Sequence, residues 1–299
     1  MRQTERSGLL LALAGFSLLS FGDAVVKSMA GQWSPVAIAA MRYLLGAIGL
    51  VALLAARQGR TAFAMPVPNI QLVRGLAVAL ASVGFFSAVF VMPLAAATAL
   101  TFTSPMLTAL LAALVLGEPA RRETWIASLI AFAGVLIVLR PNLISAGWAA
   151  LLPLLAALGM SLLMIANRYV AGKASALAMQ AFVAIMATPV LIAAALLFHA
   201  SGIERFQIGW PGWIVLAKCA VVACSATGAH WLIYLGTTRA GAATIAPMTY
   251  IQLLIASLLG WIWFGSHPDA LTLLGAAVIV GAGVYLWRAG RMPEPGMTD

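Results

Sequence analysis

The chain has 299 residues, of which 63% are hydrophobic and only 8% carry a charge, and its mean hydropathy is +1.03. Soluble domains contain about one quarter charged residues, so this composition excludes a soluble globular protein. The net charge of +9 does not indicate a nucleic-acid partner, because the basic residues gather at the ends of apolar segments.

Ten apolar segments of about 20 residues follow one another, each long enough to cross a bilayer as an α-helix. Their apolar runs are continuous rather than alternating, which favours helices over a β-barrel. The first segment resembles a signal peptide, but Asp23 stands where a cleavage site would fall, so we interpret it as a span. The predicted spans, to within about 2–4 residues, are 8–28, 35–57, 72–93, 96–116, 123–140, 148–168, 176–199, 213–237, 242–264 and 270–288. The sequence therefore predicts an all-α integral membrane protein with ten transmembrane helices.

The basic residues are distributed unevenly between the two ends of these spans. If the N-terminus is cytoplasmic, few of the 17 Lys and Arg residues fall at the outer end, namely Lys27, Arg42, Arg140, Arg205 and Lys218. This positive-inside bias predicts a multi-pass protein of the inner (plasma) membrane, surrounded by lipid, with both termini in the cytoplasm. Most tryptophans lie at span ends, as an interfacial aromatic belt requires.

An internal repeat relates the two halves of the chain, at an offset that drifts from roughly 141 to 149 residues. The matched pairs include Ser20 with Ser161, Lys27 with Arg168, Arg74 with Lys218, Gly84 with Gly228, and Thr101 with Thr249. Each half holds an odd number of spans, so the second half must be inverted relative to the first. We expect two inverted five-helix repeats, residues 1–144 and 145–299, around a central cavity lined by spans 1–4 and 6–9. Such a repeat indicates a transporter that works by alternating access.

Four stretches resemble the EamA pattern of the drug/metabolite transporter superfamily: SFGDAVVKSMAG, SPVAIAAMRYLLGA, PLAAATALTFTSPMLTALLAALVLGEP and GVLIVLRP. The residues at motif positions are Lys27, Arg42, Pro105, Gly117 and Glu118. The second half departs from the pattern, because Val183, Leu253 and Ser266 replace the arginine, the proline and the glutamate.

This resemblance implies ten helices, a central cavity and transport of a small organic metabolite, with no cofactor and no catalytic residues. Overall the chain is most similar to YddG-type exporters of aromatic and other neutral amino acids. The resemblance therefore implies an exporter or facilitator of such amino acids. The alternative is an exporter of drugs or other organic metabolites, with or without coupling to protons. The oligomeric state stays open, and a monomer is compatible with the sequence.

Spans 4 and 9 carry polar residues where lipid would favour apolar ones. Thr101, Ser104, Pro105 and Thr108 share one face of span 4. They either face a cavity, with a flexible break at the proline, or pack closely with hydroxyls bonded to their own backbone. In span 9, the residues that mirror them are Pro247, Thr249 and Gln252. The mid-span amide of Gln252 needs partners and favours a substrate contact.

Four charged residues near the span ends allow both a structural and a functional interpretation. Asp23 and Lys27 are four residues apart, the spacing of a helical ion pair, although Asp23 is also the site where a proton would couple to transport. Arg42 either attracts a substrate carboxylate or extends toward the surface. Glu118 either forms a solvated turn with a weak ion pair or takes part in gating.

Span 8 presents Thr227, His230 and Tyr234 on one face, and the repeat-related face of span 3 carries Val83, Phe86 and Phe90. Together they predict a pocket with aromatic walls and a few polar groups. His230 either bonds substrate or is a satisfied structural histidine. Trp231 is expected to point away from the pocket. The predicted substrate-binding residues are therefore His230, Tyr234, Gln252, Thr101, Ser104, Phe86, Phe90 and Thr249.

Two other classes of membrane protein were weighed against a transporter. An intramembrane hydrolase needs a nucleophile motif and a partner histidine, but His199 and His267 lie at span ends and no G-x-S-x-G or H-E-x-x-H motif is present. The two cysteines, Cys219 and Cys224, are predicted to be packing residues rather than metal ligands. A scaffold without transport activity is the second alternative.

Overall fold

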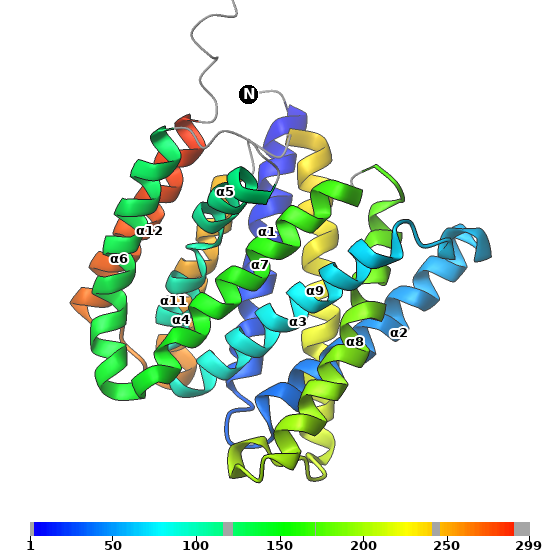
Figure 1. Cartoon of the computed structure of the whole chain (residues 1–299), viewed down its shortest axis with the longest axis horizontal. Helices are drawn as coiled ribbons and strands as arrows, with labels where there is room; N and C mark the ends of the chain where they lie inside the picture. The colour runs from blue at the N-terminus through cyan, green and yellow to red at the C-terminus, as the bar shows by residue number, and fades with distance from the viewer. Residues whose placement is uncertain (1–2, 116–121, 171, 241–245, 290–299) are drawn as a thin grey trace, which may run out of the picture.

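The computed structural model describes residues 3–115, 122–170, 172–240 and 246–289, and these residues are helical with short turns and contain no β-strand. Glu118, one of the residues singled out from the sequence, lies outside this described part of the chain. The N-terminal end of α1 and the C-terminal end of α12 lie at the same end of the molecule (Figure 1).

The helices of the first half begin and end close to the predicted limits. They are α1 (Gln3–Lys27), α2 (Pro35–Gln58), α3 (Pro68–Val91), α4 (Leu94–Thr101), α5 (Ser104–Val115) and α6 (Arg122–Ala146), with a 3-10 turn η1 (Arg60–Phe63) between α2 and α3. Proline begins α2 and α3, where a missing N–H costs no hydrogen bond.

The helices of the second half follow the same order. They are α7 (Leu152–Val170), preceded by η2 (Gly147–Leu151), α8 (Ala176–Ala200), α9 (Gly212–Ala240), α11 (Ile251–Phe264), preceded by η4 (Ala246–Tyr250), and α12 (Ala270–Ala289), with η3 (Glu204–Phe206) between α8 and α9. Within the described residues, seven helical segments are long and apolar enough to cross a membrane, and three shorter apolar helices lie at Trp125–Arg140, Met248–Phe264 and Ala270–Tyr285.

Predicted span 4 is two helices rather than one. The chain leaves the α-helix at Phe102 and Thr103, and Pro105 lies in the first turn of α5. A proline in the first turn removes no intrahelical hydrogen bond, so it starts the new helix rather than bending an old one. Span 9 has a related irregularity, because Pro247 lies in the 3-10 turn η4 that precedes α11.

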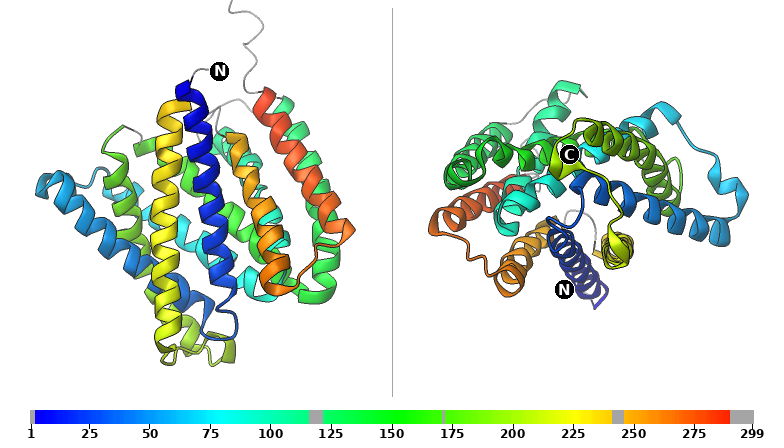
Figure 2. Two further views of the ribbon diagram at one scale, coloured as in Figure 1. Left: turned by 180° about the vertical axis from the view of Figure 1, so that it is seen from behind. Right: turned by 90° about the horizontal axis from the view of Figure 1, so that it is seen from below.

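Each helix of one half packs mainly on a helix of the other half. The pairs are α1 with α9, α3 with α7, α2 with α8, α6 with α12, and α4 with α11. Helices α1 and α9 lie side by side at the back of the molecule, and α6 and α12 form a pair at its edge (Figures 1 and 2). The predicted repeat assigns each helix of one half a counterpart in the other half. Exchanging every helix in these pairs for its counterpart gives the same set of pairs.

Glycine permits the close crossing of α3 and α7. A Cβ added at Gly159 would lie 2.6 Å from the backbone nitrogen of Ala81 and 2.7 Å from the carbonyl oxygen of Ala77. Real side chains do not approach backbone atoms this closely, so only glycine fits at this position.

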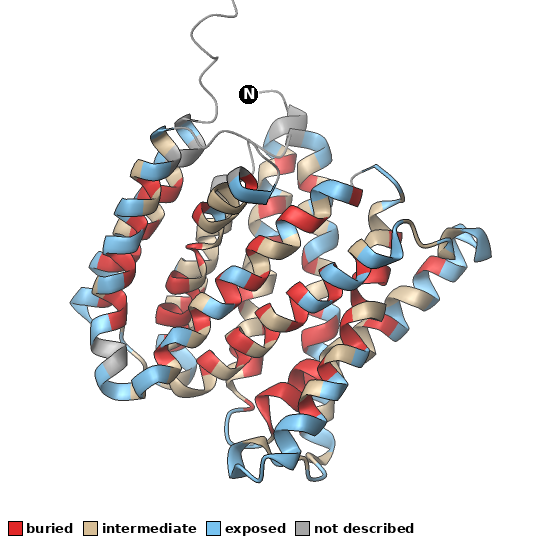
Figure 3. Ribbon diagram, in the orientation of Figure 1, coloured by how far each residue is buried: buried red, intermediate tan, exposed pale blue. Residues whose placement is uncertain are grey.

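The buried residues line the contacts between helices, whereas the outer faces are exposed and apolar (Figure 3). On α6, for example, Leu129 is 69% exposed and Phe132 is 60% exposed. Large apolar side chains on an outer surface are expected when lipid is the solvent.

Candidate functional site

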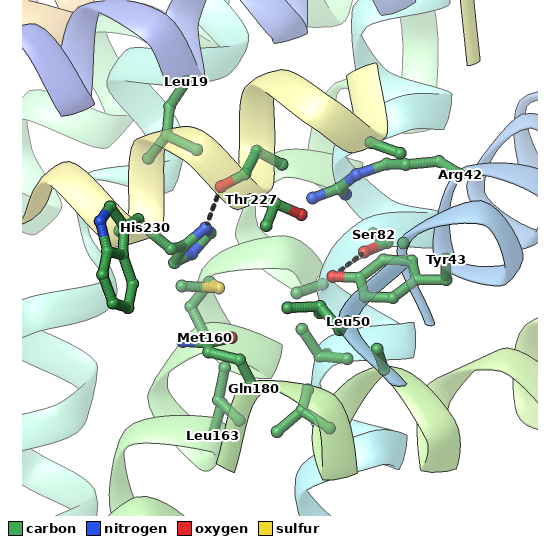
Figure 4. A pocket seen from close by; sticks show the side chains of 18 of the residues that line it. Leu19, Arg42, Tyr43, Leu50, Ser82, Met160, Leu163, Gln180, Thr227 and His230 are labelled. Carbon is green, nitrogen blue, oxygen red and sulfur yellow. Dashed lines mark hydrogen bonds between the residues drawn. The ribbon is translucent and has the colours of Figure 1, made fainter. Parts of the chain in front are cut away.

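A central cavity of about 790 Å³ lies between α1, α2, α3, α4, α7, α8, α9 and α11 (Figure 4). Residues of α6 and α12 do not contribute to its lining. Its volume is within the range of small-molecule sites, which are commonly 300–1,000 Å³. Among the described residues, no group of three His, Cys, Asp or Glu side chains is arranged to hold a metal ion.

Opposite charges meet in the deep part of the cavity. Asp23 on α1 and Arg42 on α2 both line it. The guanidinium of Arg42 lies 4.6 Å from the ring centre of Tyr43 and 5.5 Å from that of Phe86. Within the described chain, neither Asp23 nor Arg42 forms an ion pair within 4 Å or a side-chain hydrogen bond. Both groups are therefore available to a solute.

His230 on α9 presents one ring nitrogen to the cavity. Its Nδ1 lies 2.7 Å from the carbonyl oxygen of Ala226, one turn earlier. A carbonyl only accepts, so Nδ1 carries the proton and donates. The other nitrogen, Nε2, is then an acceptor in the neutral ring, on a side chain that is exposed to the cavity.

Polar side chains from α2, α3, α4 and α11 complete the deep part of the cavity. The Ser82 hydroxyl donates to the Tyr43 hydroxyl across 3.4 Å, a contact that Figure 4 marks. The Thr101 hydroxyl donates to the carbonyl of Ala97 at 2.9 Å, so it lines the cavity while its proton stays on its own helix. Gln252 also lines the cavity, and its backbone carbonyl accepts from Ser20 at 3.0 Å.

Aromatic rings form part of the walls. Phe85 and Phe86 line the cavity from α3. Trp231 and Tyr234 line it from α9, with ring centres 5.9 Å apart. Rings of this kind provide apolar contact for a flat ligand.

One end of the cavity is lined by polar and basic residues, and we call it the open end. It lies where α2 and α7 end and where α3 and α8 begin, on the side of the molecule that also holds the N-terminal end of α1 (Figure 1). The polar lining residues there are Arg57, Arg74, Asn167 and Gln180.

At the opposite end, which we call the closed end, side chains join the helices. The Lys27 ammonium donates to the carbonyls of Val89 at 2.9 Å and Met92 at 2.7 Å, where α3 ends. The Trp33 indole donates to the Gly209 carbonyl at 3.0 Å. Lys218, which matches Arg74 in the repeat, donates to the Ser28 carbonyl at 3.2 Å.

The structure places part of the predicted site around the cavity. His230, Tyr234, Gln252, Thr101 and Phe86 line it, as do Asp23 and Arg42. Phe90, Ser104 and Thr249 are not lining residues. Phe90 packs against the main hydrophobic core, and the Ser104 carbonyl accepts from Ser161 at 2.9 Å.

Two of the expectations from sequence are wrong. Lys27 does not pair with Asp23, because its ammonium bonds the carbonyls at the end of α3 instead. Trp231 was expected to point away from the pocket, but it lines the cavity beside Tyr234.

Seven polar lining residues were missed: Tyr43, Arg57, Arg74, Ser82, Thr98, Asn167 and Gln180. Gln180 and Asn167 carry amides inside apolar segments, the same signal that singled out Gln252. Arg74 was assigned to the membrane surface, since basic residues at span ends usually extend there.

Comparison with known proteins identifies the family. The model of the EamA-like transporter family matches residues 6–140 and again residues 147–288. The chain belongs to this family. It is therefore a multi-pass membrane protein that transports a small molecule.

Similar proteins have been named for several different solutes. The chain is 23% identical to the S-adenosylmethionine uptake transporter of Rickettsia prowazekii, over 95% of this chain and 93% of that one. It is 30% identical to the riboflavin transporter of Rhizobium johnstonii, over 78% and 74% of the two chains. It is also 30% identical to the pseudopaline exporter of Pseudomonas aeruginosa, over 95% and 96%. None of these three names refers to an aromatic amino acid.

A crystal structure with 20% sequence identity matches the fold with a TM-score of 0.63, covering 96% of this chain and 99% of that one. At this identity the similarity concerns the fold alone. The overall arrangement of helices is thus shared with a solved protein across nearly its whole length.

Proposed function

We propose that this EamA-family transporter carries aromatic and other neutral amino acids, or closely related metabolites that join an amino-acid group to a flat ring. The observation that carries the proposal is the composition of the cavity lining. A free carboxylate, a free guanidinium and an imidazole acceptor lie among aromatic walls in one cavity.

The charges match an amino acid, which is a zwitterion with an ammonium and a carboxylate attached to the same carbon atom. The Asp23 carboxylate and His230 Nε2 accept hydrogen bonds and suit the ammonium, whereas the Arg42 guanidinium donates and suits the carboxylate. The side chain of the amino acid then meets Phe86 and Tyr234. Two relatives are named for solutes with flat rings, and S-adenosylmethionine also bears an amino-acid group.

The proposed mechanism is alternating access between two inverted five-helix repeats, residues 1–144 and 145–299, that together span the membrane ten times. The double family match and the helix pairs that persist on exchange of the halves support this arrangement. An even number of crossings agrees with the position of the N-terminal end of α1 and the C-terminal end of α12 on one side of the molecule (Figure 1). If the positive-inside rule holds, both termini and the open end face the cytoplasm.

The simpler energetic scheme is facilitated movement down the substrate gradient. Proton-coupled transporters bury acids along their path, and among the described residues Asp23 is the one acid that lines the cavity. The alternative function, export of drugs or other metabolites coupled to protons, would use this carboxylate.

Counterflow into liposomes tests the proposal. Vesicles that hold the purified protein and unlabelled L-phenylalanine, S-adenosylmethionine or riboflavin are mixed with the same labelled solute outside. We expect accumulation of L-phenylalanine, without stimulation when a pH gradient is imposed. Accumulation of riboflavin alone would contradict an amino-acid substrate, and strong stimulation by a pH gradient would favour the proton-coupled alternative.

A further inference from the structure

Arg74 is a buried cation at the open end of the cavity. It lies on α3, is only 5% exposed and lines the cavity. Its Nε donates to Asn167 Oδ1 on α7 at 2.6 Å, and its Nη1 donates to Gln71 Oε1 and lies 3.4 Å from the Met179 sulfur. The Gln71 amide nitrogen in turn donates to the Pro66 carbonyl at 3.2 Å. The guanidinium is thus held in a fixed orientation.

No negative charge compensates Arg74. Its partners are amides and a thioether, and no acid in the described part of the chain forms an ion pair with it. Burial of a charge is costly unless an opposite charge or water compensates it. The remaining nitrogen of Arg74, Nη2, has no hydrogen-bond partner among the described residues. Every fully buried side-chain nitrogen among those residues does have a partner, so Nη2 is not fully buried. Because Arg74 lines the cavity, the cavity is the space to which Nη2 is accessible.

The charges around the cavity are unequal. Among the described lining residues, Arg42, Arg57 and Arg74 are arginines, whereas Asp23 is the one carboxylic acid. Apolar walls concentrate the field of such charges and favour an anionic solute. A simple amino acid uses Asp23 and Arg42 and leaves Arg74 without an anion.

Arg74 is also separate from the deep site. Ser82, which donates to the Tyr43 hydroxyl beside Arg42, lies about 12 Å from Arg74 along the rise of α3. Arg74 therefore lies at a different level of the cavity from the residues around Arg42. An amino acid with a second carboxylate at the far end of its ring has a comparable length.

We propose that Arg74 and Asn167 form a second carboxylate-binding subsite, which selects amino acids that carry a further acidic group on the side chain. The inference rests on the proposed function, because it takes the amino-acid group of the solute to occupy the deep site. Arg74 Nη2 and the Asn167 amide nitrogen donate to the carboxylate, a charge-assisted contact. Gln71 acts by positioning the guanidinium.

Two ligands of nearly equal shape test the subsite: 4-carboxy-L-phenylalanine and its neutral counterpart 4-carbamoyl-L-phenylalanine. Their affinities for the purified full-length protein are measured by calorimetry. Hydrogen bonds to charged groups are strong enough that the wild type should bind the carboxylate at least about tenfold more tightly than the amide.

The informative variant is Asn167→Asp. An aspartate keeps the hydrogen bond to Arg74 Nε but places a negative charge beside the guanidinium, so the preference for the carboxylate should fall to about one. Arg74→Gln should have the same effect. The matched control is Arg60→Gln, which removes an exposed charge from η1 outside the cavity and should leave the preference unchanged.

Equal affinities of the wild type for the two ligands would overturn the subsite. An unchanged preference of Asn167→Asp for the carboxylate ligand would also overturn it. A third contradicting result is an equal loss of affinity for both ligands in Asn167→Asp and Arg74→Gln, which a merely structural role predicts. Failure of L-phenylalanine counterflow would overturn the proposed substrate, while a carboxylate preference that depends on Arg74 would still support the subsite.

Discussion

Lys27 holds the closed end of the cavity together, and its replacement should open that end. The ammonium bonds the Val89 and Met92 carbonyls at the end of α3 and lies 5.5 Å from the ring centre of Phe264 on α11. These contacts join three helices that must separate if solute is to leave by this route. Lys27→Met keeps most of the side-chain volume and removes all three polar interactions.

The size of the effect follows from the contacts. A hydrogen bond to a charged group contributes about 1.5–3 kcal/mol, and an ammonium over a ring adds about 0.5–1 kcal/mol. The two hydrogen bonds alone give about 3 kcal/mol at the lower limit, and hydration of the ammonium in the opened form offsets part of this. Because 1.4 kcal/mol corresponds to a factor of ten, the population open at this end should rise by about 10- to 100-fold.

A single cysteine in the cavity reports the opening. Ala223 lines the cavity, so Ala223→Cys is combined with Cys219→Ala and Cys224→Ala and exposed to an impermeant thiol reagent on the side of the closed end. Lys27→Met should raise the labelling rate in proportion to the open population. The control is Lys173→Met, which removes an exposed charge at the other end. Equal rates in the two variants would refute the assignment of Lys27 to closure.

Four other variants have expected outcomes. His230→Ala should lower L-phenylalanine counterflow several-fold at normal expression, and undiminished flux would remove the imidazole from the site. Gly159→Ala should lower the free energy of unfolding by about 1–3 kcal/mol, because α3 and α7 must move apart to accommodate the added Cβ. The control is Gly281→Ala, where no atom lies within 4 Å of the added Cβ. In thermal unfolding this control should be neutral or stabilising by up to about 1 kcal/mol. Arg168 occupies the repeat position of Lys27, so Arg168→Met should have the opposite effect and slow the labelling of Ala223→Cys from the closed end. Faster labelling would contradict the predicted repeat.

The sequence predicted the helices well because lipid imposes a simple rule. A span must be apolar over about 20 residues, so the limits of α2 and α8 follow closely from composition. The internal structure of a span is less constrained by that rule. The break between α4 and α5 depends on where the backbone groups find hydrogen-bond partners. The sequence placed this break at Pro105, whereas α4 ends at Thr101, four residues earlier.

Site residues could be predicted where one helix face carries the signal. Thr227, His230 and Tyr234 recur at helical spacing, and all three line the cavity. Residues whose depth depends on neighbouring helices could not be predicted. Trp231 reaches the cavity because of how the other helices surround α9, and Lys27 bonds α3 because α3 ends beside it.

The two ends of α3 connect recognition with closure. Its N-terminal part carries Arg74, a buried residue that lines the open end of the cavity, while its last carbonyls accept hydrogen bonds from Lys27 at the closed end. The exchange of repeats relates α3 to α9 and Arg74 to Lys218, which bonds Ser28 at the closed end. If the two predicted repeats exchange conformations, Lys218 comes to line the cavity as the closed end opens, and Arg74 leaves its lining. A solute carboxylate would then meet a basic group at whichever end is open, so recognition and opening are coupled through the same pair of helices.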